Sequence, residues 1–322
     1  MKAIQVDSFG GPEVLKPRDL PDPQPGPGQV RIRLSAIGVN FIDVNHRNGR
    51  YSLSLPFIPG QEGAGTVDAV GDGVRTPRPG ARVAFANLPG AYAELACIPA
   101  ERAVPVPPRL TFEQAAAVML QGMTAHYLAT DTCPLVRGDV VLVHAAAGGV
   151  GLLLVQVARR RGARVIATVS TAEKEALARG AGADEVIRYT EVDFVAEVRR
   201  LTGARGVRAV YDSVGRDTFT KSLDCLSPRG MMVLFGQSSG KVEGFDPTVL
   251  GGMGSLYLTR PTLGTYISSA QGLHARASEV LGWTASGKLK VRIGATLPLA
   301  EAAEAHRRLE GRATTGKLLL LP

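Results

Sequence analysis

The pattern of apolar and polar residues divides the chain into a β-rich part and a part in which strands and helices alternate. Apolar and polar residues alternate over residues 29–39, and the start of the chain, 1–7, alternates in the same way. Such period-two alternation, bounded by turn residues, is typical of strands. Residues 1 to about 110 are therefore predicted to form a β-rich domain. Further short strands are predicted at 63–70 and 81–85, with Pro- and Gly-rich turns at 21–28 and 76–80.

From Thr111 onward the pattern changes. Thr111 followed by Gln114 fits a capping box at the start of an apolar helix. Beyond it, apolar strands alternate with helical stretches of about ten residues, which predicts a parallel, doubly wound sheet with right-handed crossovers. The predicted strands lie at 139–144, 164–169, 185–188, 208–212 and 230–235, and the predicted helices near 150–160, 172–179, 193–201 and 216–225.

The last part of the chain, after about residue 262, reads as helix, strand, helix and a final strand that ends in the leucines 318–321. This tail is too short for a third domain, so we expect it to return and complete the first one. The predicted domains are therefore 1–122 with 262–322, and 123–261.

One segment, 140–158, is nearly all apolar over the length that a membrane-spanning helix needs. Three glycines at its centre, Gly148, Gly149 and Gly151, disfavour one helix and favour a strand, a tight turn and a new helix. The start of the chain lacks the apolar core of a secretory signal. We therefore expect neither a membrane span nor a signal peptide.

The composition of the chain indicates a cellular compartment but does not indicate a binding partner. The 322 residues carry 37 Lys and Arg against 29 Asp and Glu, a net charge of +8 that is dispersed along the chain. The three cysteines, Cys97, Cys133 and Cys225, are far apart and form no C-x-x-C pair. A reducing, cytoplasmic compartment is expected.

The first strand of the alternating part leads into a glycine-rich turn that is typical of dinucleotide binding. Against the pattern G-x-G-x-x-G, the chain has Ala146, Gly148 and Gly151, followed by an apolar helix. In this context, backbone N–H groups at the start of the helix can bind a pyrophosphate. The alternative is a tight turn that binds no ligand.

The end of the next strand indicates which dinucleotide is bound. NAD enzymes carry Asp or Glu there for the ribose 2′-hydroxyl. This chain has Ser170 and Thr171, with Lys174 one helical turn later, which favours the 2′-phosphate of NADP, although Glu173 lies beside them. The alternative is that Thr171 only caps the helix and that Lys174 is solvated.

Seven motifs spread over the whole chain carry a resemblance to one family. They are FGGPEVL at 9–15, AIGVNFIDVNHRNGRY at 36–51, HAAAGGVG at 144–151, VYDSVGRDT at 210–218, SLDCLSPRG at 222–230, SLYLTRPTL at 255–263 and RATTGK at 312–317. The chain resembles the NADPH:quinone oxidoreductase (ζ-crystallin-like) branch of the zinc-free medium-chain dehydrogenase/reductases. The resemblance implies an α/β fold with a GroES-like β-rich catalytic domain and a Rossmann NADP-binding domain.

The resemblance also implies the activity. It is the reduction of quinones with NADPH, by hydride or electron transfer in an interdomain cleft, in a homodimer joined through its Rossmann sheets. The zinc alcohol dehydrogenases of the same superfamily have a Gly-His-Glu ligand motif where this chain has Gly60, Gln61 and Glu62. Neither the first cysteine ligand nor the four-cysteine lobe of those enzymes has a counterpart here, so no metal site is expected.

The site residues that the resemblance implies fall into two groups. Those expected at the acceptor are Asn40, Arg47, Tyr51 and Thr124. Those expected at NADPH are Phe41, Ile42, Asp43, Tyr127, Gly148, Gly149, Val150, Gly151, Ser170, Thr171, Lys174, Tyr189, Ser213, Phe235, Gly236, Ser238, Pro261, Leu263 and Arg312. Relatives often have a tyrosine where this chain has Asn45 or His46, which leaves the proton donor open.

Structural roles for some of these residues remain alternatives. Asn40 can cap a helix, Tyr51 can be part of the core, and Tyr189 follows a strand, where aromatic residues are common. His144 at the end of a strand reads as a buried, hydrogen-bonded histidine, whereas His126 is a weak site candidate.

Three other functions are weighed against the main one. The first is reduction of the activated double bond of an enone or alkenal. The second is RNA binding through the arginines at 159–161 and 199–200, although no RNA-binding motif accompanies them. The third is hydrolysis, because Gly236–Gly240 matches G-x-S-x-G and is followed by Asp246 and His274. A loop-like segment follows that motif, whereas a nucleophile elbow needs a helix.

Overall fold

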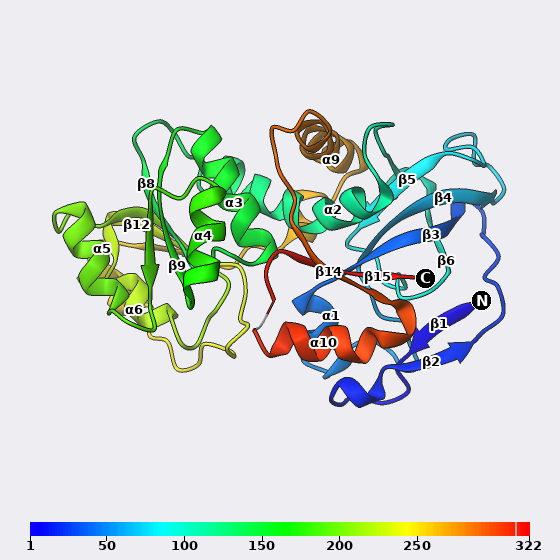
Figure 1. Ribbon diagram of the computed structural model, residues 1–322, viewed down its shortest axis with the longest axis horizontal. Coiled ribbons are helices and arrows are strands. Elements are labelled where there is room, and N and C mark those ends of the chain that lie inside the picture. The colour runs from blue at the N-terminus through cyan, green and yellow to red at the C-terminus, as the bar shows by residue number, and fades with distance from the viewer. Residues whose placement is uncertain (313) are drawn as a thin grey trace. The chain divides into compact units, whose positions relative to one another are not determined.

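The computed structural model describes residues 1–312 and 314–322, which form two compact units. Unit 1 comprises Met1–Met123 and Tyr266–Pro322, and unit 2 comprises Thr124–Thr265. Unit 2 therefore interrupts unit 1 in the sequence, as the colours of Figure 1 make visible.

Unit 1 is built on a seven-stranded sheet of order β14-β15-β3-β4-β5-β7, in which β6 also pairs with β3. All its pairs are antiparallel except β14 with β15. The strands are β3 (Gln29–Val39), β4 (Glu62–Val70), β5 (Arg82–Ala86), β6 (Leu95–Pro99), β7 (Val104–Pro105), β14 (Ile293–Pro298) and β15 (Lys317–Leu321); β1 (Lys2–Gln5) and β2 (Lys16–Asp19) form a separate hairpin. The strands predicted at 1–7, 29–39, 63–70 and 81–85 are confirmed.

The alternation in β3 explains its two faces. Val30, Ile32 and Leu34 point into the core of unit 1, whereas Arg31 and Arg33 point outward and both bind Asp68, at 2.9 and 3.1 Å. The last strand, β15, lies antiparallel beside β3 and contributes Leu318 and Leu320 to the same core. The tail of the chain is thus an integral part of the first sheet.

Helices and helical turns complete unit 1. The predicted capping box is confirmed, since Thr111 N donates to Gln114 Oε1 and Gln114 N donates to Thr111 Oγ1, both at 3.1 Å. The helix that it opens, α2, runs across the boundary into unit 2. The helical elements are η1 (Pro12–Val14), α1 (Phe41–Arg47), η2 (Ala100–Arg102), α2 (Phe112–Tyr127), α8 (Leu263–Tyr266, also across the boundary), α9 (Ala270–Ala285), η4 (Leu299–Glu301) and α10 (Ala302–Glu310).

Unit 2 is a parallel sheet with the order β10-β9-β8-β11-β12-β13, which is the strand order of a doubly wound dinucleotide-binding fold. The strands are β8 (Val140–Val143), β9 (Arg164–Val169), β10 (Glu185–Arg188), β11 (Val207–Asp212), β12 (Leu226–Leu234) and β13 (Tyr257–Thr259). The helices are α3 (Gly149–Arg160), α4 (Ala172–Gly180), α5 (Phe194–Thr202), α6 (Phe219–Leu223) and α7 (Thr248–Gly252), with the π-helical turn η3 (Leu128–Thr132).

Most predicted elements of unit 2 are confirmed, with three differences. Strand β12 begins at Leu226 rather than 230, the short edge strand β13 was not predicted, and the helix predicted at 216–225 is reduced to α6. The buried Asp212 carboxylate is the reason for the last difference. It accepts from Val214 N (2.7 Å), Gly215 N (3.0 Å) and Thr218 Oγ1 (2.7 Å), which holds the start of that segment as a loop.

The apolar segment 140–158 is strand β8, a turn and most of α3, as the glycines predicted. Among the described residues, none of the helices combines the length and the apolar character needed to cross a membrane. His144 is buried, with Nδ1 2.8 Å from Thr168 Oγ1 and Nε2 2.9 Å from Ser222 Oγ. Its interpretation as a satisfied core histidine is confirmed, and burial lowers its pKa.

Candidate functional site

The carboxyl edge of the sheet in unit 2 gathers most of the residues that were predicted to bind the cofactor. Parallel strands end at a common edge, and ligands of such folds bind there. The predicted residues directly follow five strands: Gly148, Gly149, Val150 and Gly151 after β8, Ser170, Thr171 and Lys174 after β9, Tyr189 after β10, Ser213 after β11, and Phe235, Gly236 and Ser238 after β12. The buried Pro261 and Leu263 follow the sixth, β13.

The turn between β8 and α3 lies too close to the start of α3 for a side chain at position 151. A Cβ atom on Gly151 would lie 2.4 Å from the carbonyl oxygen of Ala145 and 2.7 Å from Ala146 Cα, so glycine is required there. Ala145 itself adopts a left-handed conformation with φ of 50°, and Gly148 N donates to its carbonyl at 2.9 Å. The first turn of the twelve-residue helix α3 thus has bare backbone N–H groups at Gly149, Val150 and Gly151, where the helix dipole favours an anion.

The loop after β9 combines a helix cap with a cation. Thr171 caps α4, because its Oγ1 accepts from Lys174 N at 3.2 Å, so the capping part of the alternative interpretation is confirmed. The Lys174 ammonium also reaches Ser170 Oγ at 3.4 Å, so it lies over the end of β9. Thr190 Oγ1 donates to the Ser170 carbonyl at 3.0 Å and joins this loop to the one after β10. Tyr189, beside it, is 46% exposed.

The loops after β11 and β12 lie against each other. Ser238 N donates to the Ser213 carbonyl at 3.1 Å, and a Cβ atom on Gly236 would lie 2.6 Å from the same carbonyl oxygen. Asp212, which shapes the first of these loops, was missed by the sequence analysis. An acidic residue at the end of an apolar strand and before Ser-Val-Gly was the signal that could have found it.

The G-x-S-x-G match at Gly236–Gly240 is not a nucleophile elbow. No helix begins within it, since the next one, α7, starts at Thr248. Asp246 lies just before that helix and accepts from Thr248 N at 2.9 Å, and His274 Nε2 lies 2.8 Å from the Glu101 carbonyl. The rejection of a hydrolase is therefore supported by the local structure.

In unit 1, Asn40 is the N-cap residue of α1 and belongs to a buried polar cluster. Its Nδ2 donates to Glu62 Oε1 at 2.7 Å, and its Oδ1 accepts from Lys317 Nζ at 2.7 Å. Lys317 also donates to Glu62 Oε1, and Leu120 N donates to Glu62 Oε2 at 2.7 Å. We call Asn40, Glu62 and Lys317 the Asn40 clamp; their exposed fractions are 4%, 0% and 1%. Glu62 and Lys317 were not predicted as site residues.

Arg47 is also held inside unit 1. Its guanidinium donates to Glu310 through two nitrogens, at 2.9 and 2.8 Å, and its Nε donates to the Gly10 carbonyl at 3.1 Å. Its Nη1 lies 3.3 Å from His306 Nδ1. Burial and the charge of Arg47 lower the pKa of His306 to about 3, so this histidine is neutral. Arg47 thus links α1 to α10.

Asp43 lies in the first turn of α1 and is completely buried. Its Oδ2 accepts from Asn40 N at 2.8 Å and from the Tyr92 hydroxyl at 3.2 Å, whereas its Oδ1 has no hydrogen-bond partner among the described residues. Burial raises the pKa of Asp43 to about 7, against the opposing effects of the Asn40 N–H and the Lys317 charge. The carboxyl group therefore titrates near neutral pH.

The other predicted site residues on α1, near it and on α2 differ in accessibility. Tyr51 is 36% exposed, and its ring lies edge-on to His46 with centroids 6.2 Å apart. Burial lowers the pKa of His46. Phe41 and Ile42 are partly exposed at the start of α1. In unit 2, Thr124, His126 and Tyr127 are buried on α2, and His126 Nδ1 lies 3.1 Å from Thr130 Oγ1.

Arg312 is exposed and has a left-handed backbone, with φ of 54°. It belongs to unit 1, whereas Lys174 and Tyr189 belong to unit 2.

The described residues contain no group of three or more His, Cys, Asp and Glu side chains that could hold a metal ion. Gln61 and Glu62, at the position of the zinc-ligand motif of the related dehydrogenases, are buried, and the Glu62 carboxylate binds the Lys317 ammonium. An ammonium group in contact with this carboxylate disfavours a second cation beside it.

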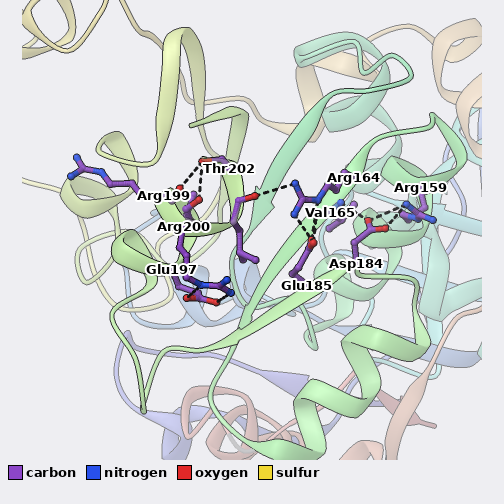
Figure 2. Close-up of polar contacts among 11 residues, drawn as sticks. Arg159, Arg164, Val165, Asp184, Glu185, Glu197, Arg199, Arg200 and Thr202 are labelled. Atoms are coloured by element: carbon purple, nitrogen blue, oxygen red, sulfur yellow. Dashed lines mark hydrogen bonds and ion pairs between the residues drawn. The ribbon is translucent and has the colours of Figure 1, made fainter. Parts of the chain in front are cut away.

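Three of the five arginines that suggested RNA binding, Arg159, Arg199 and Arg200, are paired with carboxylates. Figure 2 shows Arg159 on Asp184 at 2.7 and 3.0 Å, and Arg200 on Glu197 at 2.8 and 2.6 Å. Arg199 lies 3.8 Å from Asp224. These pairs neutralise much of the positive charge that a nucleic-acid surface would need.

Comparison with known proteins agrees with this architecture. The family model described as alcohol dehydrogenase GroES-like domain matches residues 26–108, and the one described as zinc-binding dehydrogenase matches residues 149–279. A quinone oxidoreductase of Pseudomonas aeruginosa is 48% identical over 100% of this chain and 99% of its own length. A 2-haloacrylate reductase of a Burkholderia species is 43% identical over 99% of this chain and 98% of its own.

Among solved structures, the Escherichia coli quinone oxidoreductase complexed with NADPH is similar with a TM-score of 0.98. It is 44% identical, and the similarity covers 100% of both chains. The predicted fold class, a GroES-like β-rich domain with a Rossmann domain, is confirmed.

The titration of Asp43 has a measurable consequence for stability. The folded protein binds this proton more tightly than the unfolded chain, so the stabilisation is complete below about pH 4 and is lost as the pH rises through 7. Asp43→Asn removes this dependence. Between pH 5 and pH 8 we expect the free energy of unfolding of the variant to rise relative to wild type by about 2–3 kcal/mol.

Urea unfolding of both proteins at the two pH values measures this difference, and other titrating groups cancel in it because both proteins share them. A difference that does not change with pH would show that Asp43 does not titrate in this range.

Proposed function

We propose the function of this chain from its family, since it belongs to the quinone oxidoreductases of the medium-chain dehydrogenase/reductase superfamily. The chain is an oxidoreductase that reduces quinones with NADPH. The observation that carries the proposal is the carboxyl edge of the sheet in unit 2. There a tight turn that requires glycine at position 151, a helix start and a lysine lie at the ends of adjacent strands β8 and β9.

NADPH fits the residues at this edge. The N–H groups of Gly149, Val150 and Gly151 would bind its diphosphate, and Ser170 and Lys174 its 2′-phosphate. Tyr189 offers an exposed ring to the adenosine. When bound, NADPH supplies the hydride or electrons that the acceptor receives. The protein residues bind and orient it, and Arg312 is retained as a further phosphate-binding residue.

The acceptor is proposed to bind near α1, where Tyr51 is exposed, and the cofactor candidates Phe41 and Ile42 are partly exposed at the start of the same helix. Arg47 and Asp43 are buried, and we propose that they hold α1 in place through Glu310 and Tyr92. A quinone needs little polarisation, because its reduction produces an aromatic ring. The reaction is therefore proposed to proceed without zinc, which agrees with the engaged Glu62 carboxylate.

A second candidate activity is reduction of an activated carbon–carbon double bond. The 2-haloacrylate reductase, whose substrate is such an alkene by its name, is nearly as similar to this chain as the quinone oxidoreductases are. The same binding edge for NADPH would serve both reactions.

The activity is tested by following the loss of NADPH absorbance with benzoquinones, naphthoquinones and small enones, in the presence of a chelator. We expect turnover with quinones, at a higher kcat/KM than with enones, because reduction of a quinone produces an aromatic ring. Turnover confined to alcohols with added zinc would refute the proposal, and turnover confined to enones would favour the second candidate.

The choice of cofactor is tested at Lys174. Lys174→Ala removes a charge-assisted contact to the 2′-phosphate, so the Kd of NADPH should rise about 10- to 100-fold, which corresponds to about 1.5–3 kcal/mol. The Kd of NADH, which lacks this phosphate, should change little. Arg179→Ala is the matched control, because Arg179 lies on the same helix and pairs with Glu175. Equal weakening of both cofactors would refute the role of Lys174.

We also propose that the protein is a cytoplasmic homodimer joined along strand β13. This strand ends the sheet of unit 2 and leaves Tyr257 56% exposed beside Leu258. An exposed edge strand with apolar side chains favours pairing with another strand. Light scattering should give twice the mass of the chain. The substitution Leu258→Pro removes an N–H donor from the edge strand, so the variant should have a lower measured mass. A wild-type protein of single-chain mass at micromolar concentration would contradict the dimer.

A further inference from the structure

The Asn40 clamp connects segments that lie far apart in the sequence. Asn40 lies between β3 and α1, Glu62 opens β4, and Lys317 opens β15. The clamp also reaches α2, because Leu120 N donates to the second oxygen of Glu62. All three side chains are at least 96% buried, so Glu62 and Lys317 cannot contact a substrate.

The chemistry of the clamp allows one orientation of the Asn40 amide. An ammonium group can only donate, so the atom that faces Lys317 must be the amide oxygen. An ionised carboxylate can only accept, so the atom that faces Glu62 must be the amide nitrogen. The opposite charges of Lys317 and Glu62 thus both favour the same orientation of the Asn40 side-chain amide. The nitrogen also donates weakly to the Gly38 carbonyl, at 3.4 Å.

Gly38 leaves the space that the clamp needs. A Cβ atom there would lie 2.2 Å from Glu62 Oε1, so the carboxylate packs directly against the backbone of β3. Asn40 in turn begins α1, and its N–H is bound by Asp43. The position of Asn40 therefore determines where Phe41 and Ile42, the exposed start of α1, are placed.

We propose that Glu62 and Lys317 are positioning residues for the acceptor half of the reaction, acting through Asn40 and the start of α1. The expected effect on kcat rests on the proposed function. Removal of the clamp should impair transfer to the acceptor much more than NADPH binding, because the residues proposed to bind the phosphates of NADPH, 149–151, Ser170 and Lys174, belong to unit 2 and lie outside the clamp.

The test uses the double variant Glu62→Gln/Lys317→Met, which removes both charges and so leaves no unpaired charge in the core. We expect cooperative urea unfolding as in wild type, an NADPH Kd within about twofold of wild type, and a kcat with benzoquinone reduced about tenfold or more. A double variant that keeps the wild-type kcat, or that loses NADPH affinity to the same extent as kcat, would overturn the proposal.

The matched control is Arg164→Met/Glu185→Gln. It removes another ion pair, which joins the first residues of β9 and β10 at the sheet edge opposite to the proposed cofactor site (Figure 2). The control should keep the wild-type kcat. If the double variant at the clamp does not fold, Glu62→Asp takes its place. It keeps the charge but withdraws the carboxylate by one methylene, and the same selective loss of kcat is expected.

A second readout does not depend on activity. The chain has only four asparagines, Asn40, Asn45, Asn48 and Asn87, so selective ¹⁵N labelling gives few side-chain amide signals, and an Asn40→Asp variant identifies that of Asn40. Hydrogen exchange at the Asn40 amide should be slow in wild type and much faster in the double variant. Unchanged exchange would overturn the proposal. A different outcome separates the two proposals. If the wild-type protein reduces no quinone, but exchange at the Asn40 amide is slow in wild type and fast in the double variant, the proposed function is refuted and the structural role of the clamp is kept.

Discussion

The ion pair between Glu62 and Lys317 is the interaction on which the organisation of unit 1 depends. A buried charge is tolerated in a protein core only when an opposite charge and hydrogen bonds surround it. Glu62 therefore requires Lys317, which lies 255 residues later and enters the sheet on β15. The returning tail is thus not an appendage to unit 1, because it supplies the charge that the first strands need.

The two units fix the positions of their candidate site residues in different ways. At the proposed cofactor edge of unit 2, Gly151 and Gly236 permit backbone contacts that a Cβ atom would prevent. In unit 1 side chains fix the position of α1, because Arg47, Tyr92 and His306 join this helix to its neighbours. Backbone sites tolerate little substitution at a few positions, whereas side-chain networks spread the constraint over many residues.

Local patterns in the sequence explain what could be predicted. The alternation in β3, the capping box at Thr111 and the glycines of the turn each act within a few residues, so their structural meaning is visible in the sequence. Resemblance to a family then supplied the candidate residues that follow the strands of unit 2. The clamp and the pair Arg47–Glu310 were not predicted because Lys317 lies 255 residues after Glu62, and Glu310 lies 263 residues after Arg47. Helix α6 was predicted too long because the hydrogen bonds by which Asp212 holds the preceding residues as a loop were overlooked.

The interruption of unit 1 by unit 2 also affects how the protein is made. Strands β14 and β15 leave the ribosome only after the whole of unit 2 has been synthesised. Domains usually fold in the order of their synthesis, amino-terminal domain first. Here the continuous unit 2 can fold while Glu62 still lacks its partner Lys317. Unit 1, whose synthesis begins first, is therefore completed last. During that interval the cell must keep the exposed edge of β3, which later pairs with β15, from pairing with other chains.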